Sequence, residues 1–212
     1  MIVHSLEKEN SILNTFIAEL RDENIQKDAM RFRRNIERIG EITAYELSKT
    51  LNYKKSIVKT PLGKKETKLI HEDIVLCSIL RAGLPLHQGL LNYFDAAENA
   101  YISAYRNKNS EIIVEYFASP SLENKTLILA DPMLATGSSL VAVYKALLKH
   151  GNPKKIHIVA VVGSTEGVEF IKNHFPENTE LWISTIDDKL NEKGYIIPGL
   201  GDAGDLAFGK KL

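Results

Sequence analysis

The sequence predicts an α/β protein with an open, mostly parallel sheet flanked by helices. Short, continuous apolar runs are typical of strands that are buried on both faces of a parallel sheet. Helix-like segments alternate with these runs, as they do in doubly wound sheets. The composition agrees, with 44% hydrophobic and 25% charged residues, as in ordinary globular proteins. The expected strands are residues 74–80, 100–104, 127–130, 156–162 and 181–186, and the expected helices between them are residues 84–94, 138–150 and 165–175.

Two helices are expected before the sheet, within residues 1–52. The first begins near Asn10 or Ser11, either of which can cap it, and the second covers about residues 26–51. Gly40 marks a bend or a close contact in the second helix. The arginine-rich side of that helix is expected to face solvent. Its apolar stripe must be covered by something, so these helices are candidates for an interface between subunits. The stripe consists of Phe32, Ile36, Ile39, Thr43 and Leu47.

Two further pairs of strands are predicted between the helices. Residues 56–59 and 67–70 flank the turn signal Pro61-Leu62-Gly63 and form a small hairpin. Residues 112–117 are expected to pair with residues 101–105 as a β-arm that protrudes from the sheet.

The chain ends in a glycine-rich segment, residues 187–212. It holds five of the 13 glycines, yet it also carries several large apolar side chains, which argue for an ordered, irregular backbone. We expect residues 1–212 to form one domain, since this length can bury a substantial core.

Charge and cysteine content exclude several classes of protein. The chain has 27 basic and 27 acidic residues, so a general nucleic-acid binder is disfavoured. One cysteine, Cys77, rules out a disulfide framework and a cysteine-based zinc site. The six histidines are scattered, so no metal site is expected in the protein itself. No apolar run is long enough for a membrane span, and no signal peptide is recognisable at the N-terminus, so a cytoplasmic location is expected.

The strongest local signal is a strand that ends in Asp131 and leads into a helix through a loop of small and hydroxyl residues. A helix N-terminus offers unpaired backbone N–H groups and a partial positive charge, and a glycine lets the backbone approach an anion closely. The loop is therefore predicted to hold a phosphate, although the same residues also suit a simple helix cap. No lysine follows Gly137, which disfavours a Walker A loop. The loop residues are Asp131, Pro132, Met133, Leu134, Ala135, Thr136, Gly137, Ser138 and Ser139.

Two arginines stand where they could bind a second phosphate group. Arg81 follows the strand at residues 74–80, and a guanidinium there can bind a diphosphate through paired N–H donors. A surface ion pair explains Arg81 nearly as well. Arg106, at the end of the next strand, is a weaker candidate.

The glycine-rich end contains a literal G-x-G-x-x-G between Gly199 and Gly204. A dinucleotide site would need a preceding strand and about 30 further residues of a βαβ unit, and the chain ends too soon. We interpret the glycines as shaping a loop whose backbone groups face a small planar ligand.

These three motifs, in this order, resemble those of the uracil phosphoribosyltransferase family. The family pattern DPMLATGGS appears here at residues 131–139 with one change, Ser138 in place of glycine, and the family ending GYIIPGLGDAGD appears unchanged at residues 194–205. The segment Ile79-Leu80-Arg81-Ala82-Gly83-Leu84 is similar to the family's diphosphate loop, although the residues after it depart from the pattern. The resemblance spans most of the chain and implies a type I phosphoribosyltransferase-like fold.

The resemblance implies transfer of a phosphoribosyl group from 5-phosphoribosyl 1-diphosphate (PRPP) to N1 of uracil, giving UMP and diphosphate in pyrimidine salvage. It implies that residues 131–139, Arg81, Arg106 and Asp202 bind PRPP, with Asp131 and Asp202 catalytic. Uracil would lie against Ile196, Gly201, Asp202 and Ala203.

The resemblance also implies partners beyond the two substrates. Mg²⁺ would arrive with PRPP rather than in a protein cage. A homodimer or larger homo-oligomer is expected, and GTP is an effector of some members. No membrane and no nucleic-acid partner is expected. A regulator that binds uridine nucleotides and RNA, and a phosphoribosyltransferase for another base, are the alternative interpretations.

Ser138, which replaces the family's glycine in the phosphate loop, has one of two consequences that depend on its backbone conformation. If residue 138 needs a positive φ, serine costs roughly 1 kcal/mol there. If its φ is helical, serine adds a hydrogen-bond donor. We expect the helical conformation.

Overall fold

The computed structural model describes residues 1–106 and 112–211. Within these residues, eight strands form the main sheet in the order β1-β10-β9-β7-β4-β5-β6, with β8 paired to β9. The neighbouring strands are parallel except β5 and β6, which confirms the predicted sheet. The strands are β1 (Ile2–Ser5), β4 (Ile74–Leu80), β5 (Glu98–Arg106), β6 (Ile112–Ala118), β7 (Thr126–Ala130), β8 (Met133–Leu134), β9 (Lys155–Ser164) and β10 (Glu180–Asp187).

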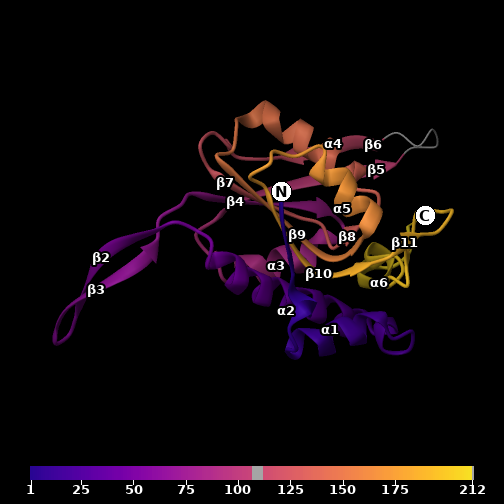
Figure 1. Cartoon of the computed structure of the whole chain (residues 1–212), viewed down its shortest axis with the longest axis horizontal. Helices are drawn as coiled ribbons and strands as arrows, with labels where there is room; N and C mark the ends of the chain where they lie inside the picture. The colour runs from indigo at the N-terminus through magenta and orange to yellow at the C-terminus, as the bar shows by residue number, and fades with distance from the viewer. Residues whose placement is uncertain (107–111, 212) are drawn as a thin grey trace.

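Helices cover both faces of this sheet (Figure 1). On one face, α1, α2 and α3 pack against the sheet, and on the other face α4 and α5 do so. Each face has its own cluster of buried apolar side chains, so the core is divided by the sheet. The helices are α1 (Ile12–Arg21), α2 (Ala29–Ser48), α3 (Gly83–Leu91), α4 (Ser138–Leu147), α5 (Thr165–Lys172) and α6 (Ala203–Phe208), and the 3-10 turns are η1 (Leu6–Lys8), η2 (Ile25–Lys27) and η3 (Leu148–His150).

The N-terminal helices begin at side-chain caps. The Ser11 hydroxyl accepts a hydrogen bond from the backbone N–H of Leu13, 3.2 Å away, as predicted for α1. Asp28 caps α2 by accepting from the N–H of Arg31 at 3.1 Å, which starts this helix at Ala29, three residues later than predicted.

The apolar stripe of α2 is buried against this chain's own sheet, helices and C-terminal segment. The stripe therefore needs no second subunit to cover it, and the argument for an interface there was wrong. Gly40 is a close contact, because a Cβ at this position would lie 2.7 Å from the carbonyl oxygen of Leu86 on α3. The arginine-rich side is not simply solvated either, since Arg33 Nη1 donates to the carbonyl of Ala207 at 2.7 Å.

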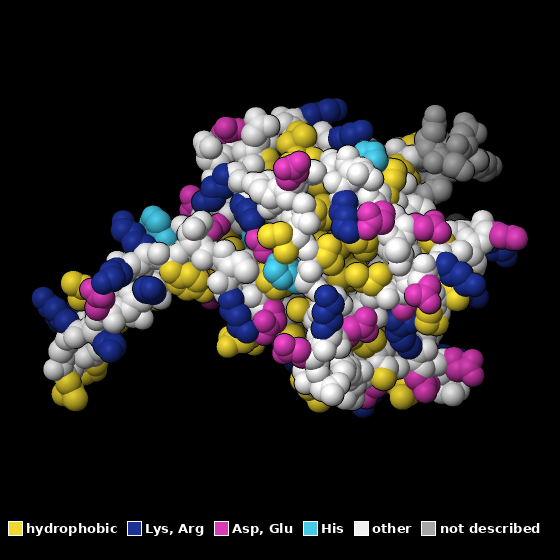
Figure 2. Space-filling view, viewed as in Figure 1, with side chains coloured by type: hydrophobic (Ala, Val, Ile, Leu, Met, Phe, Trp, Pro, Cys, Tyr) yellow, Lys and Arg dark blue, Asp and Glu magenta, His cyan; other side chains and the backbone are white. Residues whose placement is uncertain are grey.

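The hairpin predicted around Pro61 is present and longer than expected. Strands β2 (Tyr53–Thr60) and β3 (Gly63–Ile70) pair antiparallel and project far from the sheet (Figure 1). Figure 2 shows lysine side chains along this hairpin. The arm expected from residues 101–105 and 112–117 consists of β5 and β6, which pair antiparallel within the main sheet, and residues 107–111 lie outside the described part of the chain.

The C-terminal segment is ordered, as predicted. Strands β11 (Lys189–Leu190) and β12 (Ile196–Ile197) form a short antiparallel pair, and α6 follows. Ile196, Leu200 and Ala203 are buried in the same apolar cluster as α1 and α2. The N-terminal helices therefore form the base on which this segment rests. None of the described helices combines the length and apolar character that a membrane crossing requires.

Candidate active site

Two neighbouring strand ends form the floor of the candidate site. Strands β4 and β7 are adjacent and parallel, with Ser78 opposite Ala130. Strand β4 leads into α3 on one face of the sheet, and β7 leads into α4 on the other. In open α/β sheets, ligands bind at the carboxyl ends of the strands where the connections diverge in this way.

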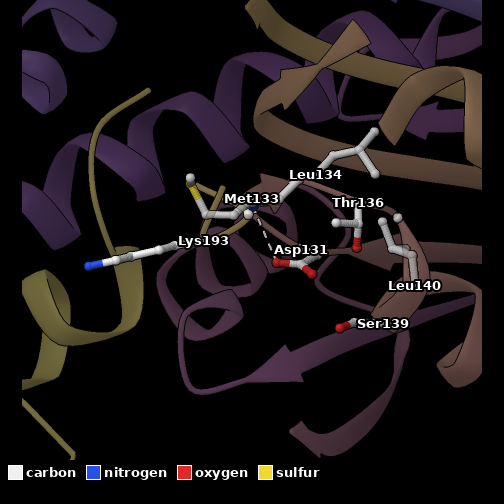
Figure 3. Close-up of a pocket in the computed structure, with 10 residues that line it drawn as sticks. Asp131, Met133, Leu134, Thr136, Ser139, Leu140 and Lys193 are labelled. Carbon is white, nitrogen blue, oxygen red and sulfur yellow. Dashed lines mark hydrogen bonds between the residues drawn. The ribbon is translucent and has the colours of Figure 1, made fainter. Parts of the chain in front are cut away.

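The loop after β7 lines a cavity of about 220 Å³. Figure 3 shows the side-chain oxygen atoms of Asp131, Thr136 and Ser139 facing a common space, whereas the Lys193 side chain extends away from Asp131. The lining residues are Asp131, Met133, Leu134, Ala135, Thr136, Gly137, Ser139, Leu140, Lys193 and Gly194.

Gly137 determines the shape of this loop. Its φ is +75°, and a Cβ there would lie 2.8 Å from Cγ2 of Ile171 on α5, so a larger residue would be strained and crowded. Gly137 is the N-cap residue of α4 and has no side chain with which to cap the helix. An anion in the cavity is favoured at this helix N-terminus, where backbone N–H groups have no partner within the helix.

Ser138 is the first residue of α4, and Asn124 is the one non-glycine with a positive φ among the described residues. The predicted helical conformation of Ser138 is confirmed. Its N–H donates to the hydroxyl of Thr136 at 3.3 Å, and the two hydroxyls are 3.0 Å apart. The serine that departs from the family pattern therefore causes no backbone strain.

Asp131 is a carboxylate in an enclosed position. Burial raises the pKa of its side chain from 3.8 to about 7, and one hydrogen bond from the N–H of Met133, at 3.2 Å, acts in the opposite direction. Desolvation is the larger effect, because burial penalises the charged form. A ligand that supplies a positive charge or hydroxyl donors would therefore be favoured beside Asp131.

A second cavity of about 290 Å³ adjoins the first. Asp131, Met133, Ala135, Ser139 and Gly194 line both, so the two form one cleft. Residues from the ends of β4 and β5 and from the C-terminal segment complete it, and these include Leu80, Arg81, Ala82, Ala104, Tyr195, Ile196, Gly201, Asp202, Ala203, Gly204 and Lys211.

Arg81 joins the strand end to the C-terminal segment. Its Nη2 donates to Asp205 Oδ1 at 3.2 Å and to the carbonyl of Gly209 at 3.0 Å. Its Nε is buried without a hydrogen-bond partner. Arg81 thus forms the ion pair that the sequence allowed as the alternative, and its Nε–H has no partner within the described residues.

Asp202 has a structural contact in addition to its place in the cavity lining. Its Oδ1 accepts from the N–H of Asp205 at 3.0 Å, which caps α6. The sequence predicted Asp202 at the site but not this cap.

The structure brings together most, but not all, of the predicted residues. Pro132 is buried below the cleft, where its carbonyl accepts from the N–H groups of Val161 and Val162. Ser138 does not line either cavity. Arg106 is the last residue of β5, and its side chain lies outside what the structure describes.

Lys193 and Lys211 line the cleft and were missed. Lys193 directly precedes the glycine-rich motif, which is a weak local signal, whereas Lys211 has no such signal in the sequence.

The described residues contain no group of three or more His, Cys, Asp or Glu side chains that could hold a metal ion. Cys77 is buried in the core, which raises the pKa of its thiol to about 12, so this thiol is inert.

Comparison with known proteins identifies the family of this chain. The family model described as uracil phosphoribosyltransferase matches residues 7–210. A uracil phosphoribosyltransferase of Porphyromonas gingivalis is 53% identical over 100% of this chain and 99% of its own length. One from Thermococcus gammatolerans is 41% identical over 99% of this chain and 94% of its own length.

Solved structures show the same fold. An Aquifex aeolicus protein superposes with a TM-score of 0.89 at 31% identity, over 98% of both chains. A purine phosphoribosyltransferase from Pyrococcus horikoshii superposes with a TM-score of 0.51 at 15% identity, over 73% of this chain and 84% of its own, and at that identity only the fold is shared. By sequence and by fold, this chain belongs to the uracil phosphoribosyltransferase family.

Proposed function

We propose that this protein transfers the phosphoribosyl group of PRPP to N1 of uracil and releases UMP and diphosphate. The observation that carries the proposal is the single cleft in which the phosphate loop, Arg81 and the glycine-rich segment meet. A sugar phosphate and a planar base can lie side by side in such a cleft.

The 5′-phosphate of PRPP would bind at residues 135–139. Support comes from the N-terminus of α4, the hydroxyls of Thr136 and Ser139, and the tight turn at Gly137. The ribose would then extend toward Asp131, whose carboxylate can accept hydrogen bonds from the sugar hydroxyls.

The diphosphate would leave on the side of Arg81. A further hollow beside the cleft is lined by Arg81, Tyr105, Lys210 and Lys211, which gives this side a positive character. Arg81 can donate from Nε and retain its contact with Asp205 through Nη2. Arg106 stays a proposed diphosphate contact from the sequence.

The base would lie against Ile196, Gly201, Asp202 and Ala203. Uracil presents an acceptor at O4 and a donor at N3, so fixed backbone N–H and C=O groups of this segment would suit uracil and mismatch cytosine. Leaving buried polar groups unpaired can reject the wrong base by about 10⁴-fold.

Phosphoribosyl transfer depends more on the positioning of the two substrates than on a strongly acidic, basic or nucleophilic side chain. Breaking the anomeric C–O bond builds positive charge on the sugar, as in glycoside cleavage, and the base itself is the nucleophile. The ionised carboxylate of Asp131 would stabilise that charge, while Asp202, which also lines the cleft, would lie near both the base and PRPP. The donors around Arg81 would stabilise the departing diphosphate, and the bound substrates would displace water from the cleft.

The donor set fits a magnesium ion that arrives with PRPP. Mg²⁺ is usually held by one or two carboxylates together with substrate phosphates and water, and Asp131 and Asp202 both line the cleft. When bound, the ion would neutralise part of the diphosphate charge. No cluster of ligands for a resident metal exists among the described residues.

Three further expectations from the sequence are carried forward as proposals. They are a homo-oligomeric state, a response to GTP and a cytoplasmic location in pyrimidine salvage. Mass measurement in solution and turnover with and without GTP test the first two.

The direct test is incubation with PRPP, Mg²⁺ and each free base in turn, with the nucleotide product followed by chromatography. We expect UMP from uracil and at least a thousandfold lower kcat/KM with cytosine. Comparable turnover of cytosine or of a purine base would contradict the proposal, and so would no product from any base.

A further inference from the structure

The last residue of α1, Arg21, is joined to the C-terminal segment by a cluster of hydrogen bonds behind the cleft. Its guanidinium binds Asp187 with both nitrogens, Nη1 to Oδ2 at 2.9 Å and Nη2 to Oδ1 at 2.7 Å. Nη1 also donates to the carbonyl of Gly199 at 3.1 Å, and Nη2 to the hydroxyl of Thr185 at 3.2 Å. One side chain thus joins a helix end, a strand end and the glycine-rich loop.

Gly199 is held at both of its backbone polar groups. Its N–H donates to Asp187 Oδ2 at 2.8 Å, and its carbonyl accepts from Arg21. The residue is buried with φ +58°, and a Cβ there would lie 2.2 Å from the carbonyl oxygen of Ile196. Its peptide orientation is therefore set by these two side chains and not by local flexibility.

The ion pair is shielded from water. The side chain of Asp187 is 8% exposed and that of Arg21 is 23% exposed. A bidentate pair in such surroundings is geometrically specific, and removing one partner leaves the other charge buried and unpaired.

Neither Arg21 nor Asp187 lines the cleft, so neither is placed to contact a substrate. Gly199, however, lies between Ile196 and Gly201, two residues that line the base side of the cleft. The position of the base-lining backbone therefore depends on a contact made outside the cleft.

We propose that Arg21 and Asp187 are positioning residues that fix the Gly199 backbone and thereby set the affinity of the cleft for uracil. This inference rests on the proposed uracil site at residues 196–203. It predicts an effect on uracil that is separate from any effect on PRPP, because the phosphate loop is held by other contacts. One of these is the hydrogen bond from Ser164 Oγ to the carbonyl of Ala135 at 2.6 Å.

The test compares Arg21→Lys and Asp187→Asn with the wild-type enzyme. Lysine keeps the positive charge of Arg21 but lacks the planar guanidinium whose paired N–H donors bind both carboxylate oxygens. Asparagine keeps the size of Asp187 but replaces one of its oxygens by an N–H₂ group, which then faces a donor. We expect the KM for uracil to rise about tenfold or more in each variant, with the KM for PRPP within about twofold. The matched control is Arg31→Lys, because Arg31 pairs with Glu19 across α1 and α2 and has no hydrogen bond to the C-terminal segment as far as residue 211. It should leave both KM values within about twofold.

Hydrogen exchange of the Gly199 amide gives a second measurement that needs no turnover. It should be slow in the wild-type protein and in Arg31→Lys, and at least tenfold faster in Asp187→Ala, which removes both side-chain oxygens and so the acceptor of this N–H. An unchanged KM for uracil in both Arg21→Lys and Asp187→Asn would overturn the inference, as would an equal rise in both KM values. If the wild-type enzyme made no UMP, the proposed function would fail, while unchanged exchange in Asp187→Ala would separately show that the Asp187 contact does not hold Gly199.

Discussion

At the scale of single residues, Asp131 combines a place in the cleft with an unfavourable environment for its charge. Burial raises its pKa from 3.8 to about 7, a change equivalent to about 4 kcal/mol between the two protonation states. Below pH 3.8 the carboxyl is protonated in both the folded and the unfolded chain, and the effect is absent. As the pH rises toward 7, only the unfolded chain ionises, so the folded state loses stability, and above 7 the loss is constant.

Asp131→Asn should therefore stabilise the ligand-free protein by up to about 4 kcal/mol at pH 8 and very little at pH 4. Asparagine cannot ionise, and its carbonyl oxygen can keep the hydrogen bond from Met133. Thermal unfolding of both proteins across this pH range measures the difference, and turnover of the variant should be at least a hundredfold lower. Equal melting temperatures at pH 8 would show that the wild-type carboxylate is not desolvated.

Gly137 and Ser138 are adjacent but should respond very differently to substitution. Gly137→Ala forces a Cβ onto a residue with φ +75° and into Ile171, so the loop must shift, and we expect about 1–3 kcal/mol lower stability. The KM for PRPP should rise at least tenfold, because the phosphate-binding N–H groups move with the loop. Ser138→Gly is the matched control and should change that KM by less than threefold. Steady-state kinetics with varied PRPP measures these KM values. A tenfold lower KM for PRPP in Ser138→Gly would contradict the interpretation that serine is accommodated in a helical conformation here.

At the scale of secondary-structure elements, α6 carries a residue with two tasks. Asp202 caps the helix and lines the cleft, so replacing it by alanine removes both contributions at once.

Asp202→Asn separates the two tasks, since asparagine is as good an N-cap as aspartate but carries no charge. We expect the asparagine variant to keep its melting temperature and to lose at least a hundredfold in kcat/KM. Asp202→Ala should lose similar activity and, in addition, about 1 kcal/mol of stability. Full activity in the asparagine variant would remove Asp202 from the list of catalytic groups.

Long apolar elements could be predicted from the sequence, and short ones could not. Strands β4, β7 and β9 are nearly continuous apolar runs, which is a strong signal. Strand β1 has four residues and contains His4, whose ring stacks on Trp182 at 3.8 Å, a contact that only the folded chain provides. Helix α6 has six residues and depends on the cap by Asp202, so its sequence pattern is too short to read.

The same limit applies to the cleft. The residues of the phosphate loop and the C-terminal motif could be predicted because their types and spacing carry the chemistry. The contribution of Lys211 depends on where the end of the chain packs, and the raised pKa of Asp131 depends on how completely neighbouring segments enclose it. Neither property is local in sequence. The bonds from Arg21 to Asp187 and Gly199 are likewise tertiary contacts across 166 and 178 positions.

At the scale of the whole molecule, the cleft is built from parts of the chain that are far apart, so a bound substrate should stabilise the entire fold. PRPP at a hundred times its Kd adds about 2.7 kcal/mol, which for a chain of 212 residues raises the melting temperature by about 5–10 °C. Thermal unfolding with PRPP and Mg²⁺ measures this shift. Gly137→Ala should give a much smaller shift at the same ligand concentration, and an equal shift would mean that PRPP binds elsewhere.

The projecting hairpin separates positive from negative charge in a chain whose net charge is zero. Residues 53–70 contain six lysines and one glutamate, while the whole chain sums to zero, so the remaining body carries five excess negative charges. The separation of opposite charge along the length of the molecule creates a large permanent dipole moment. In dilute buffer the screening length is about 30 Å, so the protein should approach an anionic surface with its lysine-rich hairpin foremost. Near 1 M salt the screening length falls to about 3 Å, and this preferred orientation should be lost.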